Sequence, residues 1–361
     1  MRPLVDVLLI GPDSTARVPS QTGPGKAMLS RHAHSCPESH RGACSNLEPV
    51  APGIVLQDNK PDDPLMIRLI VIATLTLLGS ACSRTEFAYR NADVLLEYYA
   101  WKTVRTSSAQ RDHWQPVLQT TLRHHREQEL PLVIAYLDLA GHIIREKDGS
   151  PGAACLVDGT LFLYQRHARL AAGLAAPLLA ELDDTQVRHF ARHTNQRQQE
   201  LVKRYLDPDP QTRKIGRQER ITERIEKWTG KLNDSQRHQI RDALERIPDL
   251  SASWLAYRAQ QTGALLVMLG AGANTEALRE HLDDWWVSRD GISAETERSW
   301  RIARHEFIQL MDNLATTLNE TQRTKLENRL GKLRDDLASF LPSRQQTINL
   351  ELVPACISAP A

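Results

Sequence analysis

What this sequence lacks excludes several classes of protein. Its 45 basic and 44 acidic side chains give a net charge of +1, so no excess of positive charge is available to bind a nucleic acid. Its 5 cysteines do not form the closely spaced pairs that bind metals. No apolar run reaches the about 20 residues that a membrane-spanning helix needs. The remaining composition, 25% charged and 41% hydrophobic, is typical of a globular protein.

Strand patterns are nearly absent, because no sustained alternation of β-branched and polar residues occurs. Apolar residues recur instead at spacings of three and four, which is the period of one helix face. The clearest stripe, predicted to face a partner helix, consists of Leu326, Leu330, Leu333, Leu337 and Phe340. The sequence therefore predicts an all-α fold, a multi-helix antiparallel bundle of roughly ten helices joined by short loops.

Clusters of proline and glycine divide the helical region. They lie at Leu130-Pro131, 148–152, 207–210, Pro248, 270–273 and 288–291. The first is expected to separate a polar helix ending near Glu129 from an apolar helix over residues 132–144. We predict a single domain. If a boundary exists, it lies at residues 207–210.

A short segment before Cys82 has the order of a secretory signal peptide: a positively charged start, an apolar run and small residues. It comprises Met66-Ile67-Arg68, residues 69–78 and Gly79-Ser80-Ala81. With Cys82 directly after it, the segment resembles the lipobox of bacterial lipoproteins, with Gly79 where that family has Leu. A transmembrane anchor is the alternative, but the apolar run is too short for one.

The lipobox resemblance implies that Cys82 begins the mature protein and that acyl chains on Cys82 tether it to a membrane. Such lipoproteins carry several acyl chains, and two or more make anchoring stable. Ser83 after the cysteine resembles the signal for sorting to the outer membrane. We therefore expect the protein in the cell envelope, on the inner leaflet of the outer membrane and facing the periplasm.

The segment before the signal has an unusual composition. Residues 11–65 are rich in Pro, Ser, Gly and His and lack apolar periodicity long enough for a helix or strand. We expect translation to start at Met66, so that residues 1–65 are wrongly included in the sequence. The alternative is a disordered cytoplasmic tail before an internal signal. The expected organisation is a signal peptide over 66–81, a helical domain over 82–345 and a flexible tail over 346–361.

One short pattern occurs three times, as Leu182-Asp183-Asp184-Thr185-Gln186, Leu232-Asn233-Asp234-Ser235-Gln236 and Leu318-Asn319-Glu320-Thr321-Gln322. Asp or Asn is a good N-cap, and Gln three residues later can reach back to the N–H of the cap residue, as in a capping box. We expect three helix starts. The pattern also resembles the Leu-Thr-x-x-Gln signature of Spy-like periplasmic chaperones, with Asp or Asn in place of Thr.

A wider resemblance covers the region after Cys82. It rests on Ala88-Tyr89-Arg90-Asn91-Ala92-Asp93, Tyr98-Tyr99-Ala100-Trp101, Glu129-Leu130-Pro131 and Trp228-Thr229-Gly230-Lys231-Leu232. These segments are similar to a family of uncharacterised lipoproteins of Gram-negative bacteria, a domain of unknown function. The resemblance implies an all-helical lipoprotein and carries no known activity or site residue.

Other candidate sites have ordinary structural interpretations. His189 and His193 share a helix face at metal-chelating spacing, but two adjacent arginines repel a cation. His124 and His125 are adjacent, so a helix points them to different faces. The glycine-rich turn that ends at Asn274 lacks the lysine of a phosphate-binding loop, and Asn274 is expected to cap a helix. No metal, cofactor or catalytic residue is predicted.

Four further features concern surfaces and cross-links. The basic run over 213–227 is interpreted as a solvated helix face, with binding to anionic lipid or peptidoglycan as the alternative. One ring of Trp285-Trp286 is expected to be accessible. Cys155 and Cys356 could pair as a disulfide in an oxidising periplasm. Aromatic residues near the anchor are expected in the core behind an Asn91 cap, or else in a lipid-proximal surface; they are Tyr89, Tyr98, Tyr99 and Trp101.

These observations favour a non-enzymatic, lipid-tethered envelope protein that binds other proteins, in a chaperone-like role. Its expected partners are the membrane, through acyl chains on Cys82, and other envelope proteins, with no nucleic acid and no small-molecule substrate. The alternatives are a helical enzyme acting on the cell wall or on lipid, and a structural spacer. A cleft with two carboxylates of raised pKa would favour the enzyme, whereas an open apolar face would favour the binder.

Overall fold

The computed structural model describes residues 84–145 and 152–341, and within these ranges the chain forms helices and no β-strand. The predicted all-α fold is confirmed. The α-helices are α3 (Arg84–Arg90), α4 (Ala92–Val104), α5 (Ser108–His124), α6 (Leu130–Arg145), α7 (Gly152–Ala180), α8 (Asp184–Tyr205), α9 (Pro210–Thr229), α10 (Asp234–Arg246), α11 (Ser251–Gly270), α12 (Thr275–Asp283), α13 (Ala294–Thr317) and α14 (Glu320–Ala338). Two π-helical turns are η1 (His125–Glu129) and η2 (Asp284–Ser288).

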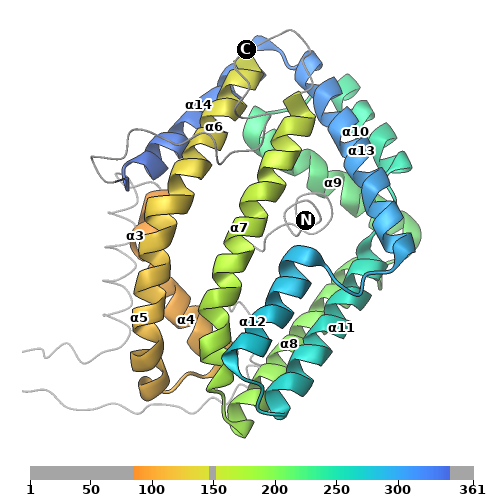
Figure 1. Cartoon of the computed structure of the whole chain (residues 1–361). Helices are drawn as coiled ribbons and strands as arrows, with labels where there is room; N and C mark the ends of the chain where they lie inside the picture. Colours follow the sequence, from red (N-terminus) through yellow and green to blue (C-terminus); the bar gives the residue numbers. More distant parts are fainter. Residues whose placement is uncertain (1–83, 146–151, 342–361) are drawn as a thin grey trace, which may run out of the picture. The chain divides into compact units, whose positions relative to one another are not determined.

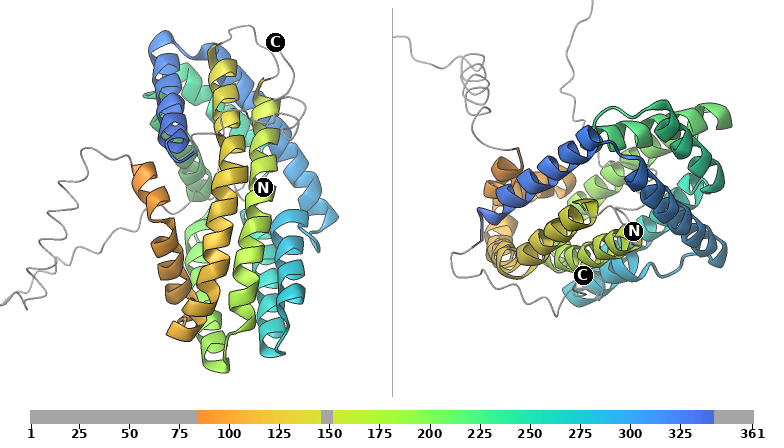
Figure 2. Two further views of the ribbon diagram at one scale, coloured as in Figure 1. Left: turned by 60° about the vertical axis from the view of Figure 1, so that its left-hand side comes forward. Right: turned by 90° about the horizontal axis from the view of Figure 1, so that it is seen from above.

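The helices pack against partners that are distant in the sequence. In Figures 1 and 2, α5, η1 and α6 form one long rod with α7 beside it. Helix α14 packs along α6, α12 along α7, α11 along α8, and α10 along α13. All described residues belong to one compact unit of the chain.

Helices α7 and α12 pack together through fully buried side chains. Ala172 and Ala176 lie four residues apart on α7, and Leu278 and Leu282 lie four apart on α12; all four side chains are inaccessible to solvent. Because the alanines carry only a methyl group, the α7 backbone leaves space for the larger leucines. Small residues on one helix and large ones on the other thus fix this contact.

The apolar stripe predicted near the end of the chain faces a partner helix, as expected. Leu330, Leu333 and Leu337 of α14 lie in one apolar cluster with Leu130 and Ile134 of α6. The partner could not be named from the sequence, because the stripe specifies a face and not what it meets.

Most predicted breaks are helix ends. Helix α8 ends at Tyr205, and Asp209 caps α9 with Pro210 in the first helical position, where a proline costs no hydrogen bond. Helix α10 ends at Arg246, before Pro248. Asn274 caps α12 and accepts a 3.0 Å bond from the backbone N–H of Ala277, as predicted.

The break predicted at Leu130-Pro131 is wrong, because the helix continues through it. The turn η1 is wound more widely, and the N–H of Leu130 bonds the carbonyl of His125, five residues back. Pro131 has no N–H, and its ring needs space beside the preceding turn. A π-helical turn provides this space without ending the helix.

Each of the three repeated motifs starts a helix, as predicted. Asp183, Asn233 and Asn319 cap α8, α10 and α14, and each forms a complete capping box with the glutamine three residues later. A fourth capping box, formed by Ser107 and Gln110 at the start of α5, was not predicted. Thr106 and Ser107 stand there in place of the Leu and the Asp or Asn of the other three.

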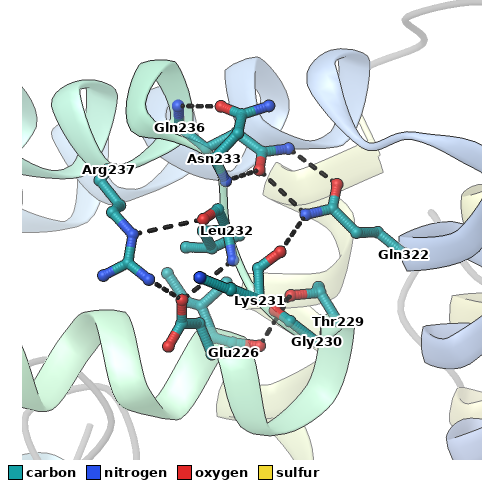
Figure 3. A network of polar contacts seen from close by, with 10 residues as sticks. Glu226, Thr229, Gly230, Lys231, Leu232, Asn233, Gln236, Arg237 and Gln322 are labelled. Atoms are coloured by element: carbon teal, nitrogen blue, oxygen red, sulfur yellow. Dashed lines mark hydrogen bonds and ion pairs between the residues drawn. The ribbon is translucent and has the colours of Figure 1, made fainter.

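The capping glutamines bind each other in pairs, which the sequence did not reveal. In Figure 3, Gln236 and Gln322 face each other and exchange two amide hydrogen bonds of 2.9 and 3.0 Å. Gln236 also donates to the carbonyl of Thr317, and Gln322 to that of Lys231. Each Oε1 accepts from the N–H of its own cap residue. Both buried amides are therefore fully hydrogen-bonded.

The same pairing occurs a second time. Gln110 and Gln186 exchange amide bonds of 2.9 and 2.7 Å. They donate to the carbonyls of Glu181 and Arg105, each five positions before the partner glutamine, which is also the relation in the first pair. We call each arrangement a glutamine clasp.

The two clasps lie in two similar sets of helices. In the set α4, α5, α7 and α8, helix α4 contacts α5 and α8, and α5 contacts α7. In the set α9, α10, α13 and α14, helix α9 contacts α10 and α14, and α10 contacts α13. The two sets therefore share the same pattern of helix contacts and the same clasp.

We predict that the clasp glutamines are energetically coupled. Gln236→Ala or Gln322→Ala removes both bonds between the two amides and one bond to a backbone carbonyl, and it leaves the other buried amide only partly satisfied, at a cost of about 1–3 kcal/mol in the free energy of unfolding. The double variant should cost less than the sum by about 1 kcal/mol, as denaturant titration would measure. Gln211→Ala, at an exposed position of α9, is the control and should change little. Additive effects would contradict the paired geometry.

Candidate functional site

The most unusual polar cluster surrounds η1. Glu129 is only 2% exposed and forms a two-pronged ion pair with Arg166 of α7, with N–O distances of 2.6 and 2.7 Å. Burial alone would raise the pKa of Glu129, but the hydrogen bonds and charge of Arg166 outweigh it and hold the pKa below its usual value. Glu129 is therefore a charged carboxylate whose ion pair with Arg166 joins η1 to α7.

A chain of three aromatic side chains runs beside this ion pair. The Tyr89 hydroxyl lies 3.0 Å from Nδ1 of His125, and Nε2 of His125 lies 3.1 Å from Nε2 of His167. Nδ1 of His167 lies 2.6 Å from the carbonyl of Leu163. Since a carbonyl only accepts, His167 donates there and accepts from His125, which accepts from Tyr89. The chain is complete with both imidazoles neutral.

The environment keeps His125 neutral. Burial, and then the nearby His167, lower the pKa of His125 to about 4. A proton added to His125 would put an N–H on Nδ1, where the ring now accepts the 3.0 Å bond from the Tyr89 hydroxyl, so this bond would have to reverse. The aromatic chain therefore holds α3, η1 and α7 together, with His125 neutral near neutral pH.

Metal binding finds no support in the described ranges, where no group of three His, Cys, Asp or Glu side chains converges on one point. His124 and His125 point apart, as predicted: His124 lies 3.6 Å from Glu129, whereas His125 faces His167. His189 approaches the carbonyl of Lys102 on α4.

Helices α3 and α4 expose a row of large apolar side chains, which we call the aromatic stripe. It consists of Phe87, Val94, Tyr98, Tyr99 and Trp101, which are 51%, 61%, 51%, 58% and 43% exposed. The expectation that Tyr98, Tyr99 and Trp101 pack in the core is therefore wrong. The opposite side of α4 is occupied, since it contacts α5 and α8.

The two short helices that carry the stripe are nearly continuous. The backbone N–H of Asn91 bonds the carbonyl of Phe87, and that of Leu95 bonds the carbonyl of Asn91. Asn91 precedes α4 but does not cap it with its side chain, which donates to the Phe87 carbonyl at 2.7 Å. Tyr89 points inward, with its ring 4.5 Å from that of Phe340.

Two expectations about surfaces need correction. Trp285 and Trp286 are both half-buried, with ring centroids 6.0 Å apart, because the π-helical turn η2 turns both rings toward the core. The run over 213–227 is not a wholly solvated face, since Arg217 is buried and donates to the carbonyl of Ile247. Arginine is long enough to bond the free carbonyls at the end of a neighbouring helix.

Several predicted residues lie outside the described ranges. They are Cys82, Cys356, the extension over 1–65, the signal over 66–81 and the tail over 346–361. Cys155, at the start of α7, is disulfide-bonded. It is the only cysteine within the described ranges, so its pairing with Cys356 stays a prediction.

The fold and these clusters define an all-helical domain held together by internal polar contacts. A family model described as a family of unknown function, DUF6279, matches residues 102–298, more than half of the 361 residues, and the chain belongs to this family. No curated protein and no solved structure matches the chain. Among the described helices, none is long and apolar enough to cross a membrane.

We predict that His125 makes the protein less stable in mild acid. The unfolded chain takes up a proton near pH 6.5, whereas folded His125 does so only at about 4, so the free energy of unfolding should fall as the pH drops between these values. Unfolding at a series of pH values measures this. His125→Asn should flatten the dependence, and His113→Asn, at an exposed site, should not. An unchanged slope in His125→Asn would refute the assignment.

Proposed function

We propose that this protein is tethered to the envelope membrane through acyl chains on Cys82 and that its helical domain acts by binding, not by catalysis. The aromatic stripe is the observation that carries this proposal. Contiguous apolar side chains at this exposure mark an interaction surface on a soluble domain. The stripe begins at Phe87, close in the sequence to the cysteine that the lipobox resemblance singles out.

The state of the buried ionisable groups supports a binding role over an enzymatic one. General acid–base catalysis works best with groups that titrate near the working pH. The pKa of Glu129 is lowered and that of His125 falls to about 4, and both side chains are held by other residues. Burial raises the pKa of Asp283, but this carboxylate pairs with Arg279 at 3.1 Å.

The expected partners of the helical domain are other envelope proteins, contacted in a chaperone-like manner. Val267 on α11 and Ile302 on α13 are exposed apolar side chains outside the stripe, and they provide contact points for such partners. The alternatives are a helical enzyme that acts on the cell wall or on lipid, and a spacer with no partner of its own.

The first prediction concerns the proposed lipid tether at Cys82. In a Gram-negative host supplied with labelled palmitate, the full chain should become labelled, and Cys82→Ala should abolish the label. Cys155→Ala is the matched control, because it removes a different cysteine and should leave labelling intact. Label that persists in Cys82→Ala would refute lipidation at this residue.

Binding to envelope proteins makes the second prediction. A photoreactive residue at Val267 or Ile302 should form discrete crosslinks to identified envelope proteins in living cells, several times more than one at the exposed Arg298 of α13. Val267→Asp should reduce the crosslink formed from position 302 if both side chains meet one partner. Absence of protein crosslinks, together with turnover of a cell-wall fragment by the purified chain, would favour the enzyme.

A further inference from the structure

We propose that the aromatic stripe on α3 and α4 rests on the lipid bilayer, with its rings among the headgroups beside the acylated Cys82. This inference rests on the tether proposed above and names what the stripe contacts. It assigns the stripe to lipid, which leaves other surfaces of the domain for protein partners.

The stripe has the geometry of a helix that lies along a surface. Phe87, Val94, Tyr98 and Trp101 follow one another at spacings of seven, four and three residues, so they share one side of the nearly continuous α3–α4 segment. At 1.5 Å per residue, the row from Phe87 to Trp101 is about 21 Å long. Such a row can contact the membrane interface along its whole length while the inward side of α4 stays packed on α5 and α8.

The chemistry of the stripe suits the headgroup region. Tyrosine and tryptophan have an apolar ring with a polar group and concentrate at this depth of a bilayer. Lys102 is exposed beside them, and the guanidinium of the exposed Arg105 lies 4.4 Å from the Trp101 ring centre, where both can meet anionic headgroups. The exposed Arg90 pairs with Glu86 at 2.9 Å, so part of its charge is already compensated.

The acidic side chains of these helices are less exposed than the stripe. Glu86, Asp93 and Glu97 are each only partly exposed, whereas every member of the stripe is exposed. Glu97 borders the stripe, because it lies three residues after Val94 and four before Trp101, but the exposed charges beside Trp101 are the basic Lys102 and Arg105. This is the charge distribution that an anionic bilayer attracts.

The short length of chain between the lipid and the stripe keeps the two close together. Phe87 follows Cys82 by five residues, and a fully extended residue spans at most about 3.5 Å, so the stripe begins within about 17 Å of the acylated cysteine. The two headgroup regions together add about 10–15 Å to the hydrocarbon core, so each is about 5–7 Å thick. A tether this short brings α3 to the membrane surface.

A second copy of the chain is a weaker occupant. A stable dimer buries about 800 Å² on each partner. Five side chains that are about half exposed supply roughly 500 Å², if a fully buried aromatic side chain contributes 150–250 Å². The stripe is thus too small to hold a dimer by itself but large enough to orient a protein that lipid already anchors.

Quenching of Trp101 by the bilayer tests the inference. The full-length lipidated protein is placed in anionic vesicles whose acyl chains are brominated near the headgroup, and its emission is compared with that in unbrominated vesicles. The difference between the wild type and Trp101→Phe isolates one of the 7 tryptophans. We expect Trp101→Phe to lose most of the quenching, and Trp228→Phe, at a half-exposed site on α9, to retain it. Val94→Asp should weaken the quenching while Trp101 remains in place.

The outcomes separate the two proposals. If the lipidated protein floats with the vesicles but Trp101→Phe quenches like the wild type, the bilayer contact is wrong and the tether stands. If the chain carries no lipid and does not float, the tether is wrong and the contact falls with it. A dimer in solution that Trp101→Phe dissociates would assign the stripe to a second copy and overturn the inference.

Discussion

The glutamine clasp is the interaction on which the arrangement of this domain depends. A buried amide is costly unless all its donors and acceptors are used, and in each clasp two glutamines satisfy one another, two helix caps and two carbonyls. The helix starts are therefore coupled in pairs. The Oε1 of each clasp glutamine accepts a bond from the N–H of its own cap residue and another from the glutamine of the other helix. Gln110–Gln186 and Gln236–Gln322 fix the relative positions of α5 and α8 and of α10 and α14.

Local signals allowed much of the fold to be predicted, and long-range contacts explain what was missed. The caps at Asp183, Asn233 and Asn319 and the apolar stripe of α14 depend on spacing within a few residues, so the sequence displays them directly. The helix across Pro131 was missed because a π-helical turn depends on packing around η1. The contact of His125 with His167 joins residues that are 42 positions apart, and no pattern in the sequence connects them.

The helix nearest to Cys82 in the sequence is held on its inner side and free on its outer side. Tyr89 fixes α3 to η1 through His125 and to the end of α14 through the ring of Phe340. The exposed members of the aromatic stripe follow on the same nearly continuous segment. An apolar surface on a firmly held helix keeps one orientation relative to the domain, whereas the same residues on a loose leader would not. This rigidity is what a surface needs if it is to set the angle of a tethered domain.

The use of polar groups inside the domain explains why binding is the better proposal. Catalysis requires groups poised to exchange protons or attack a substrate, and these are costly to keep unpaired. Here the buried ionisable groups already have hydrogen-bond partners. Glu129 is paired with Arg166, and Arg217 donates to the Ile247 carbonyl. His125 is bonded to Tyr89 and His167. The apolar side chains of the stripe show the reverse, since they are exposed and no helix among the described residues covers them. The side chains that remain available to bind a partner therefore lie on the surface of the domain, beside the proposed tether, and not in its interior.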